Sequence, residues 1–257
     1  MRVSVAAAPV VVAAALAGCG GSTATSAEPV TRQVAAPRPP AKTCRLGVES
    51  RLGSKRVAYA GVAQRPLLAY RSPGGARFTT FPRVNANGVP NVFGVLGVVK
   101  GRDCQPRWFR VELPMRPNGS IGWIRAKAVW IGRVRTRIEI DVSRRRLTFF
   151  RNGRAVLTAT TAVGAPATPT PTGRFYVNQR LIPTDPHGPF GPGAIGISAF
   201  SNVLTGWTQG GPVAIHGTNE PWSIGRSVSN GCIRLPNPIL RRLFRSVPAG
   251  TPVVIHA

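Results

Sequence analysis

Residues 215–237 read IHGTNEPWSIGRSVSNGCIRLPN, and they place one of the chain's three histidines and one of its four cysteines in a glycine-rich run. The preceding residues, GPVAIHG (211–217), are mostly small or β-branched, which is typical of a buried strand. That strand ends at His216. Glycine and proline recur through residues 217–231, so we expect a loop that folds back and brings Cys232 to the strand end.

The surrounding residues predict a β-rich domain over 136–257. Apolar and polar residues alternate on both sides of RNGR (151–154), which predicts a hairpin with Asn152-Gly153 as its turn. TPTGRFYVNQ (170–179) and GTPVVIHA (250–257) predict two more strands. One helix is expected after the cysteine, with Asn237 as N-cap and Pro238 at the first helical position. Its apolar face comprises Ile239, Leu240, Leu243, Phe244 and Val247.

Residues 44–132 show short β-type runs separated by turn residues. These runs are PLLAY (66–70), NVFGVLGVVK (91–100), RWFRVELP (107–114) and RPNGSIGWIR (116–125). Asn118-Gly119 is typical of a two-residue type I′ hairpin turn. Several short strands without a helical period predict a small closed β-barrel. The segment resembles a bacterial SH3-like domain, and either a wall-binding module or a structural spacer fits it.

The N-terminus has the pattern of an export signal. Arg2 precedes a run of small apolar residues from Val3 to Ala17, which is long enough for a signal peptide and too short for a stable membrane span. Its end, LAGC (16–19), resembles the lipobox of bacterial lipoproteins, which predicts a signal peptide over 1–18 and lipidation of Cys19. Two acyl chains suffice for stable anchoring to the outer face of the cell membrane. Residues 19–43 are small, polar and proline-rich, and we expect a disordered tether.

The chain is strongly basic, with 34 Lys and Arg against 8 Asp and Glu and a formal net charge of +26. Such a balance often indicates nucleic-acid binding. Export argues against nucleic acid as the partner and favours anionic wall polymers. The positive chain attracts these polymers by the same long-range electrostatics. We expect no nucleic-acid partner and no cofactor.

The cysteines follow the pattern of an oxidising compartment. With Cys19 assigned to lipidation, we pair Cys44 with Cys104, because both lie in the first domain. Cys232 is then a free thiol where free thiols are a liability, which indicates a chemical role.

A thiol nucleophile needs a base within hydrogen-bond reach, and histidine is the side chain whose pKa lies nearest neutral pH. Cys232 and His216 supply the two roles. Gly231 allows a substrate carbonyl to approach the backbone, and the adjoining amides are candidate oxyanion donors. In an extended segment Arg234 lies on the same side as Cys232, where its charge would lower the pKa of the thiol or bind a substrate carboxylate.

Other assignments of these residues are weaker. A zinc site would need members of the set Asp185, His187, His216, Cys232 and His256. None of these residues belongs to a ligand motif such as HxxxH or CxxC, so no metal site is expected. Trp207 and Trp222 either wall a substrate groove or pack in the core or a lid. Asp141 is expected to satisfy a turn, and a backbone carbonyl near Gly217 to fix the imidazole tautomer.

Together, HGT (216–218) and SNGCIR (229–234) resemble the signature of the YkuD-type L,D-transpeptidases, and comparable segments extend the resemblance over about 137–257. The resemblance implies a peptidoglycan cross-linking enzyme of cell wall biogenesis and cell shape. Cys232 would attack the carbonyl of the third stem residue of a donor tetrapeptide, expelling D-alanine, and His216 would move the protons. The acceptor would be the side-chain amine of a neighbouring stem. Gly217, Ser229, Asn230, Gly231 and Arg234 would shape the substrate and oxyanion sites.

The chain departs from many members at two positions of this signature. It has Asn230 where they have a second histidine, and Arg234 where they have asparagine. The departures leave acceptor preference open. Two alternatives remain: an L,D-carboxypeptidase of the same architecture, and a non-enzymatic lipoprotein that binds wall polymers. A sortase-like enzyme also uses cysteine, histidine and arginine, but it lacks the run Gly-Cys-Ile-Arg.

Overall fold

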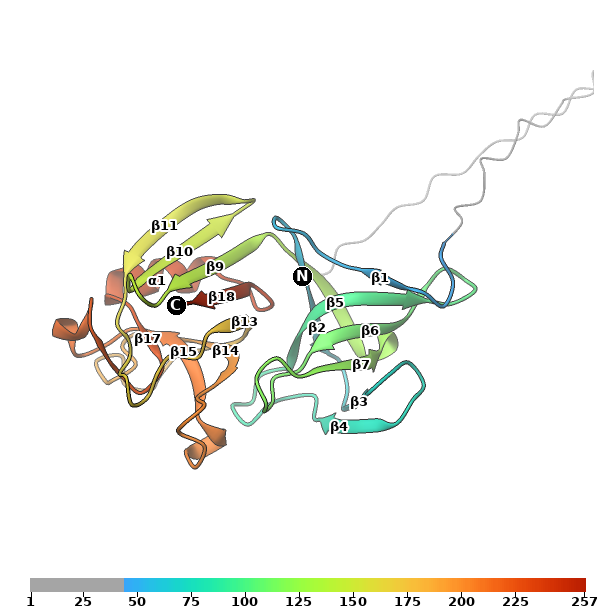
Figure 1. Ribbon diagram of the computed structural model, residues 1–257, viewed down its shortest axis with the longest axis horizontal. Helices are drawn as coiled ribbons and strands as arrows, with labels where there is room; N and C mark the ends of the chain where they lie inside the picture. The colour runs from blue at the N-terminus through green and yellow to red at the C-terminus, as the bar shows by residue number, and fades with distance from the viewer. Residues whose placement is uncertain (1–43) are drawn as a thin grey trace, which may run out of the picture. The chain divides into compact units, whose positions relative to one another are not determined.

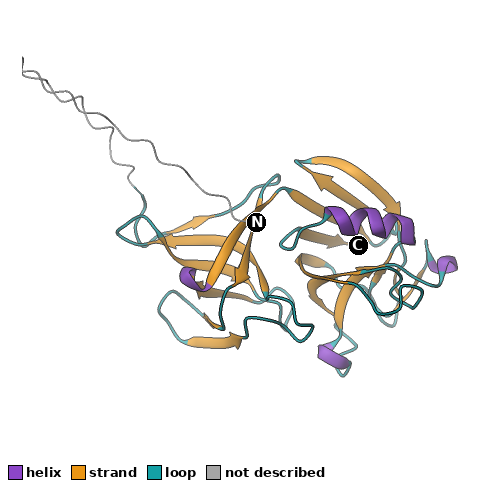
Figure 2. Ribbon diagram, turned by 180° about the vertical axis from the view of Figure 1, so that it is seen from behind, coloured by secondary structure: helices purple, strands orange, loops and turns teal. Residues whose placement is uncertain are grey.

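The computed structural model describes residues 44–257, all within one compact unit that holds two eight-stranded sheets (Figures 1 and 2). One α-helix lies in the described range, so the prediction of a mainly β protein with one clear helix is confirmed. No helix among these residues is long and apolar enough to cross a membrane. The predicted signal peptide (1–18), the lipidation site Cys19 and the tether (19–43) lie outside the described residues.

The first sheet is formed by β1–β8 in the order β4-β3-β7-β6-β5-β2-β8, with β1 paired to β5. Its strands are β1 Glu49–Arg51, β2 Ala58–Ala63, β3 Leu67–Tyr70, β4 Arg77–Phe81, β5 Val92–Lys100, β6 Pro106–Glu112, β7 Ile121–Arg125 and β8 Val129–Val134. A short 3₁₀ turn, η1 (Ala126–Ala128), precedes β8. Alternate residues such as Phe109, Val111 and Ile124 are buried in its core.

This sheet differs from the predicted closed barrel. The hydrogen-bonded path is open, with β4 and β8 at its ends. Among the described strands β8 pairs only with β2 and β4 only with β3, so no ladder joins the two ends. The specific SH3-like assignment and the domain boundaries at 44–132 and 136–257 stay predictions.

The two predicted hairpin turns have different outcomes. Asn152 and Gly153 both have positive φ, 52° and 82°, as a type I′ turn requires, and they join β10 to β11. At the other site only Gly119 has positive φ, so the type I′ prediction is wrong there. The side chain of Asn118 instead brackets Phe200 of the second sheet, accepting from its N–H at 2.9 Å and donating to its carbonyl at 2.8 Å.

The second sheet has the order β11-β10-β9-β18-β13-β14-β15-β17. Its strands are β9 Thr136–Asp141, β10 Arg146–Arg151, β11 Arg154–Thr160, β13 Gly173–Leu181, β14 Ala194–Phe200, β15 Pro212–His216, β17 Ile233–Arg234 and β18 Pro252–His256. A separate parallel pair, β12 (Val163–Gly164) and β16 (Ser227–Ser229), lies beside the end of this sheet. Two 3₁₀ turns, η2 (Thr208–Gly210) and η3 (Pro221–Ser223), lie in the connecting loops.

Helix α1 (Asn237–Ser246) covers one face of the second sheet (Figure 2). Leu240, Leu243 and Val247 are fully buried in the core of that sheet, as the predicted apolar face requires. The predicted N-cap is wrong by one residue, because the cap position is Pro236. Asn237 lies inside the helix, where its Oδ1 accepts a hydrogen bond from the Thr218 N–H at 2.8 Å. The side chain therefore holds the loop after His216 instead of capping the helix.

Tyr176 of β13 joins the two sheets. Its ring packs so closely on Gly94 that a Cβ there would lie 2.8 Å from the ring, and its hydroxyl donates to the Val92 carbonyl at 2.9 Å. Tyr176 shares a small buried cluster with Ala60, Val92 and Val134 of the first sheet. A tyrosine is suited to this position because its ring buries a large apolar area while its hydroxyl finds a partner.

The structure confirms the predicted disulfide between Cys44 and Cys104, which closes a chain segment with a sequence separation of 60. Replacing both cysteines with serine is expected to lower the free energy of unfolding by about 2–4 kcal/mol, because the unfolded chain regains the entropy that the cross-link removes. Urea unfolding followed by tryptophan fluorescence measures the change. Wild type in reductant is the control and should lose a similar amount, while an unchanged midpoint in both would contradict the expectation.

Candidate active site

The register of two neighbouring strands brings Cys232 to the strand that carries His216. Strands β15 and β17 are parallel, and Ile215 pairs with Ile233 and His216 with Arg234. Because side chains alternate along strands, His216 and Arg234 point to the same side, and Cys232, two residues before Arg234, points there too. The Cys232 Sγ accepts a hydrogen bond from the Ala214 N–H at 3.4 Å, two residues before His216 on β15. The predicted loop therefore does bring the thiol to the end of the histidine strand.

The His216 ring is held in one orientation. Its Nδ1 lies 2.5 Å from the Gly217 carbonyl, as predicted for a carbonyl near that residue, so Nδ1 carries the proton and Nε2 is left as the basic nitrogen. The Phe190 ring packs edge-on against it at 5.0 Å between centroids. The side chain is buried, with the residue 4% exposed. The pKa of His216 is lowered to about 4. Burial is the main cause, the Gly217 hydrogen bond opposes it, and the charge of Arg234 adds a smaller lowering effect.

The Cys232 thiol is the free cysteine of the described range, and the residue is partly exposed. Burial of the sulfur raises the pKa of the thiol, against the opposing effects of the Ala214 amide and of Arg234. The charge of Arg234 thus lowers the pKa of the thiol, as predicted, but desolvation has the larger effect and the net shift is upward. At neutral pH the pair is therefore a neutral thiol beside a neutral imidazole.

Hydrogen bonds fix the backbone turn that leads into Cys232. The Ser229 hydroxyl donates to the Cys232 carbonyl at 2.6 Å and accepts from the Gly231 N–H at 3.2 Å. Thr170 donates to the Gly231 carbonyl at 3.0 Å, and Thr168 donates to the Ser229 carbonyl at 2.9 Å. Gly231 has a φ of +105°, which a residue with a side chain rarely adopts. Its own amide donates to Ser229, and the assignment of the adjoining amides as oxyanion donors stays a prediction.

Arg234 forms an ion pair with Glu220 of the intervening loop. Its side chain is 18% exposed, and its Nε is buried without a hydrogen-bond partner among the described residues. Buried donors of this kind are rare because an unmade hydrogen bond costs free energy. One donor of Arg234 is therefore left unused by the described residues.

The remaining predicted residues surround this centre in different ways. Gly217 is buried and has no room for a side chain, since a Cβ would lie 2.3 Å from the Asn237 Oδ1, and its N–H donates to Gly193 at 3.3 Å. Asn230 is exposed. Trp207 and Trp222 are 52% and 56% exposed, so packing of either in the core is excluded.

The residues considered for zinc are not assembled into a site. No group of three or more histidine, cysteine or acidic side chains among residues 44–257 is placed to hold a metal ion. His187 lies in an exposed turn, where its N–H donates to Asp185. Asp141 accepts from Ser143 and from the Arg144 N–H and lies 3.8 Å from His256. Asp141 therefore satisfies a turn, as expected.

Sequence reasoning missed several residues that support the site. Glu220 is the partner of Arg234, and the only signal for it was an acidic residue between the histidine and the cysteine in a chain with 8 acids in all. Thr168 and Thr170 lie within the proline-rich turn TPTPTG (168–173), which indicated a turn but not its contact with the cysteine loop. Phe190 carried no signal beyond its apolar character.

The residues that form the second sheet match a known protein family. The family model of the YkuD L,D-transpeptidase catalytic domain matches residues 135–255. The Bacillus subtilis protein that bears the name L,D-transpeptidase YkuD is 40% identical over 119 residues, or 46% of this chain and 65% of that protein. The Escherichia coli protein named L,D-transpeptidase ErfK/SrfK is 40% identical over 94 residues, or 34% of this chain and 26% of that protein. The chain thus spans less than two thirds of the length of either relative.

Two solved structures of L,D-transpeptidases also resemble part of the chain. A crystal structure of an Enterococcus faecium L,D-transpeptidase mutant is 28% identical, with a TM-score of 0.38, over 47% of this chain and 49% of that one. An L,D-transpeptidase from Mycobacterium smegmatis is 18% identical, with a TM-score of 0.39, over 65% of this chain and 90% of that one. The part of the chain over residues 135–255 is therefore similar to the YkuD family of L,D-transpeptidase catalytic domains.

Proposed function

We propose that the chain is a peptidoglycan L,D-transpeptidase that cross-links stem peptides through an acyl-enzyme on Cys232. The supporting observation is the β15–β17 register, which pairs His216 with Arg234 and sets Cys232 on the same side. The donor is a tetrapeptide stem ending in D-alanine, and the acceptor is a side-chain amine of a neighbouring stem.

Acylation begins with a neutral pair. The Cys232 thiol gives its proton to Nε2 of His216 as the sulfur attacks the carbonyl carbon of the third stem residue. The bond from that carbon to the nitrogen of D-alanine then breaks, and His216 returns the proton to the departing amine. The raised pKa of the thiol and the lowered pKa of His216 favour this coupled transfer over a preformed thiolate.

The second half-reaction restores the enzyme. The acceptor amine attacks the thioester carbon, the sulfur leaves, and the proton lost by the amine returns through His216 to Cys232. Attack by water instead of the amine would release a tripeptide, which is the reaction of the carboxypeptidase alternative.

The neighbouring residues have supporting roles in this proposal. Arg234, with its buried and unpartnered Nε, binds a carbonyl or carboxylate of the donor. Ser229 and Gly231 hold the turn that carries the nucleophile, and Gly217 fixes the histidine tautomer. Asn230, which is exposed beside the turn, contacts the stem peptide.

The protein is proposed to act outside the cytoplasm, on the wall side of the cell membrane. The export signal and the lipidation of Cys19 anchor it there, and the first sheet acts as an SH3-like module between anchor and catalyst. Peptidoglycan stems are then the substrates, and no cofactor is needed for thioester chemistry.

Intact-protein mass spectrometry of the purified chain with a disaccharide-tetrapeptide tests the proposal. We expect a covalent adduct that lacks D-alanine, located on Cys232 after digestion, together with a cross-linked dimer among the products. Tripeptide without dimer would identify the carboxypeptidase. The absence of both adduct and turnover would contradict an enzyme and favour the polymer-binding lipoprotein.

A further inference from the structure

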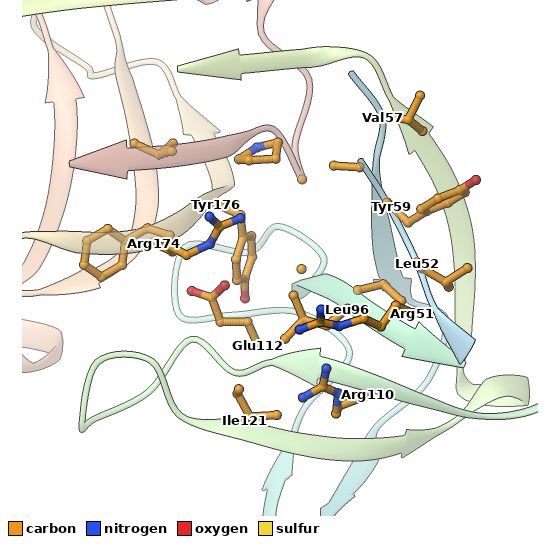
Figure 3. Close-up of a pocket in the computed structure, with 18 of the residues that line it drawn as sticks. Arg51, Leu52, Val57, Tyr59, Leu96, Arg110, Glu112, Ile121, Arg174 and Tyr176 are labelled. Carbon is orange, nitrogen blue, oxygen red and sulfur yellow. The ribbon is translucent and has the colours of Figure 1, made fainter. Parts of the chain in front are cut away.

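A cleft of about 820 Å³ lies between the two sheets and shares no residue with the candidate active site. The first sheet contributes Arg51, Arg110 and Glu112, and the second contributes Arg174 and Tyr176 (Figure 3). Apolar side chains such as Leu52, Leu96 and Ile121 also line it. The cleft is therefore large enough for an organic ligand and has both charged and apolar walls.

The sheet register places two of the arginines beside a glycine. Gly97 of β5 pairs with Arg51 of β1 on one side and with Arg110 of β6 on the other. Residues in register point to the same face, so both arginines flank Gly97. The Glu49 carboxylate lies over this glycine, since a Cβ there would be 2.2 Å from the Glu49 Oε1. Arg110 is bonded to Glu49 at 2.7 Å. Arg51 forms no side-chain hydrogen bond or ion pair with any residue in the range 44–257.

The acid in the cleft does not cancel this positive charge. Glu112 accepts a hydrogen bond from Ser198 at 3.2 Å, and burial raises its pKa to about 7, against the effect of Ser198 and of Arg174. Near neutral pH the carboxyl group is therefore only partly ionised. Glu49 compensates Arg110, so Arg51 and Arg174 are the lining arginines that attract anions to the cleft.

A second arginine group lies across one loop. A depression of about 530 Å³ is lined by Arg56, Arg151, Asn152, Gly153, Arg154 and Val156. Ser54 and Val57 line the first cleft, so the loop that contains Arg56 borders both. The Ser54 hydroxyl fixes this loop by accepting from the Arg56 and Val57 amides, each at 3.2 Å.

Three arginines of the second group lack protein partners. Within the described part of the chain, Arg56, Arg151 and Arg154 form no side-chain hydrogen bond and no ion pair. Guanidinium groups bind carboxylate and phosphate oxygens in a bidentate manner, and free ones on two sides of one loop match repeated anionic groups better than a single ion.

We propose that the cleft and the adjoining depression bind a chain of repeated oxyanions, with one anionic group at Arg51 and Arg174 and the next at Arg56 and Arg154. The apolar wall of the cleft contacts the uncharged carbon skeleton between them. The formal net charge of +26 attracts such a polymer from a distance, and the arginine groups then fix where it lies. The site is separate from the Cys232 chemistry and does not depend on it.

Fluorescence anisotropy of labelled poly(glycerol phosphate) with the purified full chain, at physiological salt, measures the site. The double variants Arg51→Gln/Arg174→Gln and Arg56→Gln/Arg154→Gln are each expected to bind at least about tenfold more weakly, since each removes charge-assisted hydrogen bonds. The matched control, Arg65→Gln/Arg241→Gln, removes two charges from exposed arginines elsewhere. It is expected to change affinity by less than about threefold, through net charge alone. Equal weakening by all three variants at unchanged melting temperature would overturn the proposal.

Two further probes identify the anionic group and its source. Poly-γ-glutamate with the same number of charges presents carboxylates in place of phosphodiesters. The double variants at the cleft and the depression should weaken binding of one polymer more than of the other. That polymer carries the anionic group that the site recognises. Inorganic phosphate is the test for a single ion. If it competes as well, per anionic group, as either polymer, the requirement for a chain is wrong.

Discussion

Replacing Cys232 with alanine is expected to abolish release of D-alanine and formation of dimer, with a loss of at least about 10⁴-fold, as removal of a covalent nucleophile causes in other acyl-transfer enzymes. The sulfur is the atom that forms the acyl-enzyme in the proposed mechanism. No other free cysteine lies in the described range to replace it. Product analysis by liquid chromatography, with a fixed excess of tetrapeptide, measures the loss.

Two controls separate chemistry from folding in this experiment. The Cys232→Ser variant keeps a hydrogen-bond acceptor for the Ala214 amide but has a far less acidic and less nucleophilic group. It should therefore be as inactive as Cys232→Ala while melting at the wild-type temperature. Residual turnover within tenfold of wild type in either variant would show that another group carries the acyl chain.

The second large effect is expected at His216. Replacing it with glutamine should lower the rate of acylation by about 10²–10⁴-fold, the usual contribution of a positioned general base. The loss should depend on pH. Without a base the variant reacts only through the thiolate, whose fraction rises tenfold per pH unit below the raised pKa of Cys232. The gap between variant and wild type is thus expected to narrow as pH rises.

The wild-type profile tests the buried environment of His216. The base must be unprotonated to act, and its pKa is lowered to about 4, so it is ready to accept a proton at all pH values well above that. The acylation rate should accordingly fall only below about pH 5, instead of near the ordinary histidine value of about 6.5. Stopped-flow measurement of the acylation rate from pH 3.5 to 8 shows at which pH the rate falls. A midpoint near 6.5 would contradict the neutral, desolvated pair.

The parts of this molecule that were predictable from sequence are those fixed by local patterns. Alternation around Asn152-Gly153 predicted a hairpin because both positions of its turn favour positive φ. The apolar face of α1 follows from a spacing that sequence displays directly. His216 and Cys232 could be predicted from sequence for another reason. Their residue types are rare in the chain, and the surrounding motif resembles a known signature.

The parts that were not predictable depend on contacts between distant segments. Asn118 left the expected turn geometry because Phe200, far along the chain, uses its side chain. Asn237 lost its capping role to the Thr218 amide. The raised pKa of Cys232 results from burial. The sequence shows the nearby Arg234, which lowers this pKa, but it does not show how deeply the sulfur is buried. In each case the outcome depends on segments that are distant in sequence, through a hydrogen bond or through burial, and not on the local pattern.

The parallel pairing of β15 with β17 sets limits on how this domain tolerates insertions and deletions. The proposed nucleophile and base are aligned by a ladder that begins at Ile215 and Ile233, and not by the length of the loop between them. Residues can therefore be added or lost within that loop during evolution or engineering while the pair keeps its alignment. One residue inserted between Cys232 and Ile233 would instead turn the thiol to the opposite face of the sheet. The length of the loop can thus vary and change substrate choice, whereas the length of the segment from Cys232 to Arg234 cannot vary.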